Sequence, residues 1–204
     1  MIFCLRLLTN WEVKGRENVP NEGPLLVVSN HMNNADPPLV AVSIPRKTAF
    51  MAKEELFKSP ISRYFVRGFG AFPVNRTTID RNALREAKEV LSDGWCLVMF
   101  PEGMRSRTGT LRPAFSGSAL IAAQSKATVL PVGITGTEKM GGWKWIFQRP
   151  RIVVNIGKPF TLQLTNGRVN KEELAGLTDD LMCHIAELLP VKYHGYYTDK
   201  VIRQ

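Results

Sequence analysis

Cysteine is scarce in this sequence and a long hydrophobic run is missing, and each shortage excludes a class of protein. The three cysteines, Cys4, Cys96 and Cys183, are widely spaced, without the Cys-x-x-Cys or Cys/His clusters typical of metal sites. We therefore expect a reducing compartment, no structural zinc and no other metal. No window reaches the roughly 18 consecutive apolar residues of a spanning helix, so we expect no transmembrane segment.

Basic residues are in excess. Lys and Arg number 27 against 18 Asp and Glu, which gives a formal charge of +9. This charge favours an anionic partner such as phosphate, phospholipid or nucleic acid. No helix-turn-helix, zinc-finger or RNA-binding motif accompanies it. A chain of 204 residues with 44% hydrophobic content is typical of one globular domain.

Three further segments carry apolar or aromatic residues outside the regular patterns. Residues 1–11 are apolar over only a few residues, carry Arg6 inside that run and lack a signal-peptide cleavage site, so they form either a short interfacial segment or a core strand. Residues 57–72 and 139–151 interleave aromatic with basic side chains, which suits the headgroup zone of an anionic membrane. The alternative is that these aromatics are core and the bases are solvated. We expect the polar and aromatic tail, residues 191–204, to pack loosely.

Short hydrophobic runs alternate with amphipathic segments, a pattern typical of an α/β sheet with helices on its faces. The predicted strands are 25–29, 48–52, 71–74, 96–100, 128–134 and 151–156. The predicted helices run from an N-cap at Asp36, from an N-cap at Asp80 to Gly94, over 113–125, and from about Asn170 to Pro190.

His31 and Asp36 lie in the predicted turn after the first of these strands. A continuous helix would place them roughly 140° apart around its axis, so only a loop lets them pair. An imidazole held by a carboxylate accepts the proton of an alcohol near neutral pH. The alternative is that Asp36, followed by Pro37, only caps the next helix and that His31 is an ordinary loop histidine.

Ligands of open α/β sheets bind at the carboxyl ends of the strands, so the residues that follow the other strands belong to the candidate site. These residues are Lys53, Asn75 and Arg76, and, in the loop PEGMRSRTG, Glu102, Gly103, Arg105 and Arg107. Each cation taken alone also fits a solvated surface position. Together with the histidine and its carboxylate they indicate a site for an anionic substrate.

Four blocks of this sequence resemble the four motifs of the glycerolipid acyltransferases, in particular the 1-acylglycerol-3-phosphate acyltransferases. The blocks, in order, are NHMNNAD (30–36), with the His-x4-Asp spacing, GAFPVNR (70–76), FPEGMRS (100–106) and VLPVGI (129–134). The resemblance covers roughly residues 12–160. It implies a single acyltransferase domain over 1–204, with a mostly parallel mixed sheet flanked by helices.

The resemblance also implies a reaction. A fatty acyl group passes from acyl-CoA or acyl carrier protein to the free hydroxyl of 1-acylglycerol-3-phosphate, giving phosphatidic acid without a cofactor. In this mechanism His31 is the general base and Asp36 fixes its tautomer. No serine or cysteine lies in a recognisable nucleophile elbow, so the alcohol attacks the thioester directly.

Substrate-binding roles follow for the remaining residues. Arg76 and Arg105 are the first candidates for the substrate phosphate, because a guanidinium matches phosphate oxygens bidentately, and Lys53 is a weaker one. Glu102 is expected to orient those arginines or to accept a hydrogen bond from the glycerol part, and Gly103 to let the backbone approach the ligand.

Oxyanion donors are expected among the turn amides near Asn30 or Gly133. The sequence departs from the family pattern at Met104, where threonine is usual, and at Asn33, where serine is common. Only about 30 residues precede His31, so membrane attachment would rest on the first dozen residues and on the basic aromatic stretches.

We therefore expect a peripheral protein at the cytoplasmic face of the membrane, with no nucleic-acid partner. Two alternatives remain open. The first keeps the chemistry but changes the acceptor to glycerol-3-phosphate, another lysophospholipid or a glycolipid, with the arginines free to bind coenzyme A phosphates instead. The second is a non-enzymatic basic protein that binds nucleic acid or a membrane.

Overall fold

The hydrophobic run after Pro24 forms the central strand of the molecule, β2 (Leu25–Ser29), and all five of its residues are buried. Burial on both faces is typical of a strand inside a parallel sheet covered by helices. The computed structural model describes residues 9–68, 70–74, 81–143, 145–164 and 170–202.

Among the described residues, eight strands form one sheet in the order β1-β7-β6-β2-β5-β3-β4, and β8 pairs with β6. Strands β2 to β6 are mutually parallel, whereas β7 is antiparallel to β6 and β1 is parallel to β7. The carboxyl ends of β2 to β6 therefore meet at one edge, called here the carboxyl edge. The strands other than β2 are β1 (Asn10–Lys14), β3 (Thr48–Lys53), β4 (Ala71–Val74), β5 (Cys96–Met99), β6 (Thr128–Thr135), β7 (Arg151–Ile156) and β8 (Phe160–Thr161).

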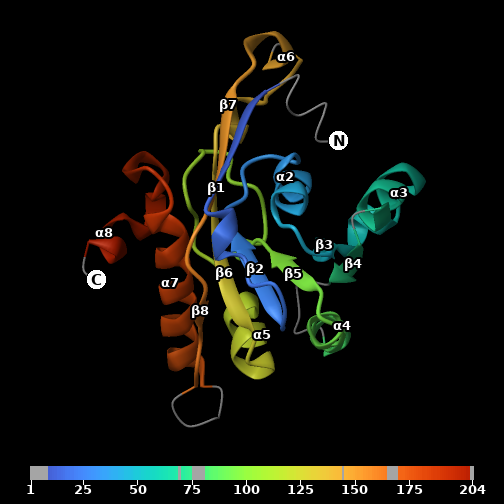
Figure 1. Cartoon of the computed structure of the whole chain (residues 1–204), viewed down its shortest axis with the longest axis vertical. Helices are drawn as coiled ribbons and strands as arrows, with labels where there is room; N and C mark the ends of the chain where they lie inside the picture. The colour runs from blue at the N-terminus through green and yellow to red at the C-terminus, as the bar shows by residue number, and fades with distance from the viewer. Residues whose placement is uncertain (1–8, 69, 75–80, 144, 165–169, 203–204) are drawn as a thin grey trace.

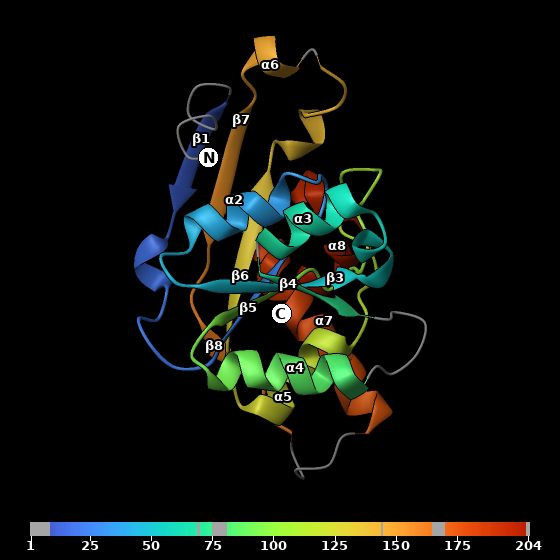
Figure 2. The ribbon, with the colours of Figure 1, turned by 90° about the vertical axis from the view of Figure 1, so that its right-hand side faces the viewer.

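Helices cover both faces of the sheet, and each face has its own hydrophobic core (Figure 1). Figure 2 shows α2 and α3 on one side of β3 and β4, and α4 and α5 on the other. This arrangement confirms the predicted single α/β domain with a mostly parallel mixed sheet. The helices are α2 (Asp36–Ser43), α3 (Pro60–Gly68), α4 (Arg81–Ser92), α5 (Gly117–Ser125), α6 (Trp145–Gln148), α7 (Lys171–Glu187) and α8 (Thr198–Val201).

Every predicted strand is present, and both ends of each strand lie within one residue of the predicted positions. The longest helix, α7, begins as predicted at Asn170, whose Oδ1 accepts a hydrogen bond from the amide of Glu173 at 2.7 Å. Residues 10–14 form strand β1, so the end of the 1–11 segment belongs to a strand and not to an interfacial segment. Residues 1–8 lie outside the described residues. Within the described part, the helices are too short or too polar to cross a bilayer.

The helix predicted over 113–125 begins only at Gly117, so its first four residues were predicted wrongly. The amide of Ala114 donates to the Tyr197 hydroxyl at 3.1 Å, and the amide of Phe115 donates to the carbonyl of Pro101 at 2.9 Å. These long-range partners hold the segment out of the helical path. Local sequence gives no sign of either partner.

The tail was predicted to pack loosely, and this is wrong for its described part. It forms the 3₁₀ turns η4 (Val191–Tyr193) and η5 (Gly195–Tyr197), and Tyr193 and Tyr197 are both buried. The Leu111 amide donates to the Tyr193 carbonyl at 2.8 Å, and the Tyr196 amide donates to the Leu111 carbonyl at 3.1 Å. The tail therefore anchors the loop that follows β5.

We expect Tyr197→Phe to lower the free energy of unfolding by about 1–3 kcal/mol, because it leaves the Ala114 amide without its buried acceptor. Urea unfolding followed by circular dichroism measures the change. The matched control is Tyr196→Phe, whose ring is exposed and which should change stability by about 0.5 kcal/mol or less. Equal effects of the two variants would contradict the anchoring role.

Candidate active site

The loop between β2 and α2 is fixed at its first residue. The Asn30 side chain makes two hydrogen bonds to the backbone of Ile134 in the neighbouring strand β6, with Nδ2 to the carbonyl at 2.9 Å and Oδ1 to the amide at 2.7 Å. A side chain bound in this way continues the sheet ladder past the end of β2. The chain therefore leaves the carboxyl edge at a defined position, and His31 follows directly.

His31 and Asp36 form the predicted pair, with 2.9 Å between Nδ1 and Oδ2. The same Oδ2 accepts the backbone amides of Met32 at 2.6 Å and Asn33 at 2.7 Å. The Asp36 side chain is fully buried, whereas that of His31 is 16% exposed. A carboxylate acceptor assigns the hydrogen to Nδ1, so Nε2 keeps the lone pair that a general base needs.

The prediction that Asp36 caps the following helix is wrong. The N-cap position is Ala35, and Asp36 is the first helical residue, without a side-chain bond to the helix. Pro37 and Pro38 have no amide hydrogen to offer, and the next amide, that of Leu39, bonds the Ala35 carbonyl. The carboxylate therefore turns back towards the loop amides.

Glu102 links the His31 loop to the loop after β5. Its Oε1 accepts the His31 amide at 3.0 Å, and its Oε2 accepts the Arg112 amide at 3.0 Å. The residue is only 2% exposed, and burial raises the pKa of its carboxyl from the ordinary 4.5 to about 7, against the opposing effect of the two amides. Both oxygens are occupied by backbone, so in this geometry Glu102 holds the loops rather than an arginine or a glycerol group.

Two more contacts hold His31, one at its imidazole ring and one at its backbone. The ring stacks on Phe100 with 4.3 Å between centroids, and the Ser106 amide donates to the His31 carbonyl at 2.7 Å.

Gly103 has a φ of 69°, and a Cβ there would lie 2.8 Å from the Phe115 ring. Glycine at this position is therefore required by the shape of the loop itself.

The predicted phosphate-binding cations have three different outcomes. Arg105 is exposed and, among the described residues, has no hydrogen-bond or ion-pair partner. Lys53 ends β3 at the carboxyl edge and pairs with Glu55, with 2.9 Å between Nζ and Oε1. Arg76 lies outside the described residues, as does Asn75. Of the three predicted phosphate-binding cations, Arg105 is thus the described one without an acidic partner.

A family model described as Acyltransferase matches residues 10–135. The chain belongs to the acyltransferase family. This confirms the family predicted from the four sequence blocks, all of which fall within the match.

Named relatives and a solved structure support the same family. The chain is 30% identical to the 1-acyl-sn-glycerol-3-phosphate acyltransferase of Streptococcus pneumoniae over 78% of its own length, but it spans only 61% of that protein. It is 28% identical to the Bacillus subtilis enzyme of the same name over 87% of both chains. The crystal structure of the 1-acyl-sn-glycerophosphate acyltransferase from Thermotoga maritima superposes with a TM-score of 0.68 at 30% identity, covering 91% of this chain and 73% of that one.

The expected oxyanion donors of the acyltransferase are not at the expected places. The amides of His31, Met32 and Asn33 all bind carboxylate oxygens. Gly133 lies inside β6, where a Cβ would meet the Leu188 side chain at 2.8 Å, so its missing side chain serves packing against the end of α7. In this geometry the amides of His31, Met32 and Asn33 are therefore not free to stabilise an oxyanion.

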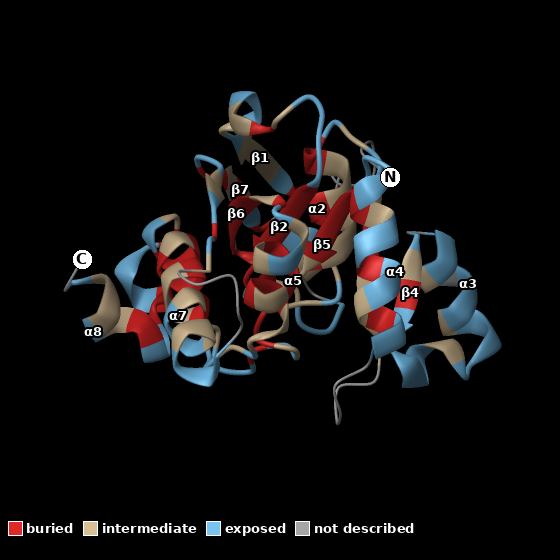
Figure 3. Ribbon diagram, turned by 90° about the horizontal axis from the view of Figure 1, so that it is seen from below, coloured by how far each residue is buried: buried red, intermediate tan, exposed pale blue. Residues whose placement is uncertain are grey.

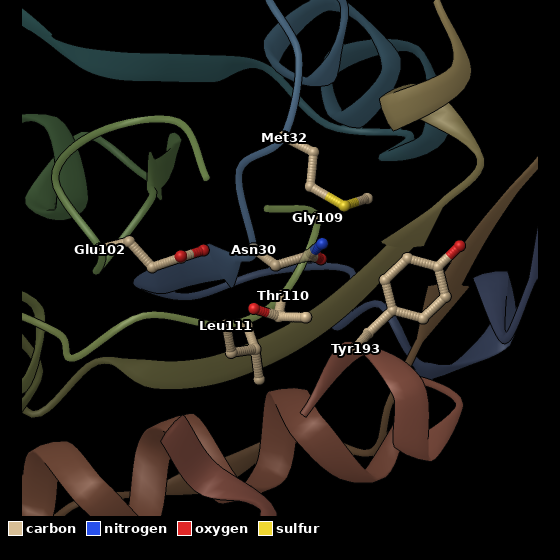
Figure 4. A pocket seen from close by; sticks show the side chains of 7 residues that line it. All are labelled: Asn30, Met32, Glu102, Gly109, Thr110, Leu111 and Tyr193. Carbon is tan, nitrogen blue, oxygen red and sulfur yellow. The ribbon is translucent and has the colours of Figure 1, made fainter. Parts of the chain in front are cut away.

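A small space lies behind the His31 loop of the acyltransferase, as Figure 4 shows. It leaves essentially no room for even a water-sized molecule, whereas ligand pockets begin at roughly 300 Å³. We therefore place no lipid there. Within the described residues, no group of three or more potential metal ligands is found. The residues that line the space are Asn30, Met32, Glu102, Gly109, Thr110, Leu111 and Tyr193.

The raised pKa of Glu102 predicts a specific pH dependence. Because the folded state holds this proton more tightly, Glu102 stabilises the fold fully below about pH 4.5 and loses that contribution as the pH rises to about 7. The unfolding free energy of the native chain should fall relative to that of Glu102→Gln by on the order of 3 kcal/mol across this window. Urea titrations at several pH values measure it, with exposed Glu22→Gln as control. Parallel curves for the native chain and Glu102→Gln would sink the prediction.

Proposed function

We propose that this acyltransferase transfers a fatty acyl group from an acyl thioester, acyl-CoA or acyl carrier protein, to the free hydroxyl of 1-acylglycerol-3-phosphate, giving phosphatidic acid. The observation that carries the proposal is the His31–Asp36 pair at the carboxyl edge of an acyltransferase domain. The names of the relatives support this choice of acceptor. The reaction needs no cofactor beyond the thioester.

His31 acts as the general base. Its Nε2 takes the hydroxyl proton of the acceptor while the oxygen attacks the thioester carbonyl, and the negative charge of Asp36 stabilises the imidazolium that forms. The new oxygen–carbon bond forms, the carbon–sulfur bond breaks, and the thiolate recovers the proton from the imidazolium. Stacking on Phe100 and the hydrogen bond from Nδ1 leave the imidazole little freedom, which favours a productive orientation.

Arg105 binds the acceptor phosphate in this proposal, with Arg76 and Lys53 as further cations. The exposed guanidinium of Arg105 supports the assignment, and the ion pair with Glu55 makes Lys53 the weaker member. Gly103 and Glu102 contribute by shaping the loop that carries Arg105. The same cations fit the phosphates of coenzyme A, and glycerol-3-phosphate or another lysophospholipid fits the same chemistry.

The substrate class places the acyltransferase at a membrane. We propose that it is peripheral and acts at the cytoplasmic face, held there by anionic lipid. Its formal charge of +9 supports attraction to such a surface. Nucleic acid is not a partner in this proposal.

Replacing the base tests the proposal. We expect His31→Ala to reduce acyl transfer from acyl-CoA to 1-acylglycerol-3-phosphate by about 10²–10⁴-fold, and Asp36→Asn by a similar factor, with the fold retained by circular dichroism. Mass spectrometry of the products from mixed acceptors and thioesters identifies the acceptor and the donor. His184→Ala, on the surface of α7, is the matched control and should remain active. Near-normal turnover by His31→Ala would remove it from the role of base.

Arg105 gives a separate test of phosphate binding. We expect Arg105→Ala to raise the KM for the phosphorylated acceptor by about 10–100-fold with a smaller change in kcat, because a charge-assisted contact is lost. Arg107→Ala, exposed in the same loop, is the control. A rise confined to the KM for acyl-CoA would reassign Arg105 to the thioester.

A further inference from the structure

Two groups of large apolar side chains are exposed to solvent on this protein. The first, called here the α3 projection, comprises residues 56–67, in which Ile61 and Tyr64 are 74% and 79% exposed. The second, called the α6 projection, comprises Trp143 and residues 145–148, in which Trp143 and Phe147 are 67% and 78% exposed. Single exposed apolar residues are normal on soluble proteins, but such groups indicate a surface that binds a partner.

The α3 projection exposes two large apolar side chains on one face of its helix. Ile61 and Tyr64 are three residues apart and share one face of the helix, whereas the partly covered Ser62 and Val66 lie on the opposite face. Figure 3 shows α3 as a largely exposed helix at the margin of the molecule, beside β4. Ser62 and Val66 therefore lie on the side of the helix that faces the protein, and Ile61 and Tyr64 lie on the side that faces solvent.

The α6 projection repeats this arrangement on another element. The rings of Trp143 and Phe147 meet edge to face with 5.9 Å between centroids, so they protrude as one aromatic unit. The projection joins β6 to β7 and extends past the body of the sheet in Figures 1 and 2. The interpretation of these aromatics as core is thus wrong for Tyr64, Trp143 and Phe147, whereas Phe57 and Trp145 are partly buried and Phe72 is buried.

The net positive charge around the two projections indicates which kind of partner they bind. No acidic residue occurs from position 56 to 79 or from 139 to 171. Lys58, Arg63 and Arg67 are exposed in or beside the α3 projection, and Lys139 and Arg149 flank the α6 projection. Aromatic side chains interleaved with bases match the interface of a bilayer, where rings lie at the headgroup level and bases meet lipid phosphates.

Both projections belong to the edge that carries His31. The chain enters the α3 projection from the end of β3 and the α6 projection from the end of β6, and both strands run parallel to β2. In the sheet order, β6 lies next to β2 on one side, and β3 lies two places away on the other. The two projections therefore leave the sheet on opposite sides of the His31 loop.

We propose that the α3 and α6 projections form a docking surface for a bilayer that contains anionic phospholipid. Their aromatic and aliphatic side chains enter the headgroup zone, and their bases contact the phosphates. Docking through both would bring the carboxyl edge, with His31, to the depth at which a lipid hydroxyl lies. Only this last consequence rests on the proposed function; binding to the bilayer does not.

Vesicle sedimentation of the full chain tests the proposal without any substrate. The probes are phosphatidylcholine vesicles, with or without about one-quarter phosphatidylglycerol, in about 0.1 M and about 0.5 M NaCl. We expect binding to the anionic vesicles that weakens at the higher salt concentration. The double variants Ile61→Ser with Tyr64→Ser, and Trp143→Ser with Phe147→Ser, should each lower the partition coefficient by about tenfold.

The matched control is Val191→Ser with Ile202→Ser, which removes two equally exposed apolar side chains from the C-terminal segment and should bind like the native chain. Arg63→Gln with Arg67→Gln should reduce the preference for anionic vesicles. Circular dichroism confirms that each variant folds, and acyl transfer between short-chain, water-soluble substrates should stay unchanged.

Three outcomes would overturn the proposal. In the first, both serine variants bind vesicles like the native chain. In the second, the control variant loses as much binding as they do. In the third, the native chain does not bind vesicles, and the serine variants instead lose self-association or binding to an acidic carrier protein. A chain that binds vesicles but fails to acylate 1-acylglycerol-3-phosphate would refute the proposed function and leave the docking surface standing.

Discussion

One buried carboxylate oxygen, Oδ2 of Asp36, determines the shape of the candidate site. It gathers the imidazole of His31 and the amides of Met32 and Asn33, all within 2.9 Å. A buried charge needs several donors to offset the loss of water, and the loop supplies them by folding around the oxygen. The position of the imidazole is therefore a consequence of charge solvation by the loop. A neutral side chain of the same size would hold the loop less firmly and would not stabilise an imidazolium.

A second carboxylate extends this constraint to the C-terminal end of the chain. Glu102 joins the His31 amide to the Arg112 amide, and the segment around Arg112 is in turn bound by Tyr193 and Tyr197. Three segments distant in sequence thus share one set of hydrogen bonds. If the tail lost these contacts, the loop after β5 would be held less firmly, and so would the backbone of His31. The buried tyrosines are for this reason part of the support of the site, although they lie outside every motif block.

The sequence predicts the parts of the structure that depend on neighbouring residues. The run from Leu25 to Val28 is apolar, as expected of a strand covered on both faces, and this run alone identifies the strand. The N-cap at Asn170 likewise depends only on neighbouring residues. The His31–Asp36 pair was predictable because the buried strand before it and the Asp36-Pro37 step after it indicate a loop, in which the two side chains can pair, and because the other motif blocks support the same site. The roles of Glu102, of the oxyanion amides and of residues 113–116 were not, because their partners, such as Tyr197, lie far along the chain.

The distribution of charge explains how a basic protein holds an acidic site for an anionic substrate. Asp36 and Glu102 are buried, and they bind backbone amides of their own loops or of the one beside them, so little of their charge faces the substrate. Arg105, by contrast, is exposed at the same edge. In the proposed reaction, an approaching phosphate would meet the exposed Arg105 before it came near the two buried carboxylates. Under the proposed function, buried carboxylates that position the loops and an exposed guanidinium that binds substrate would let one edge of the sheet hold both a base and a phosphate.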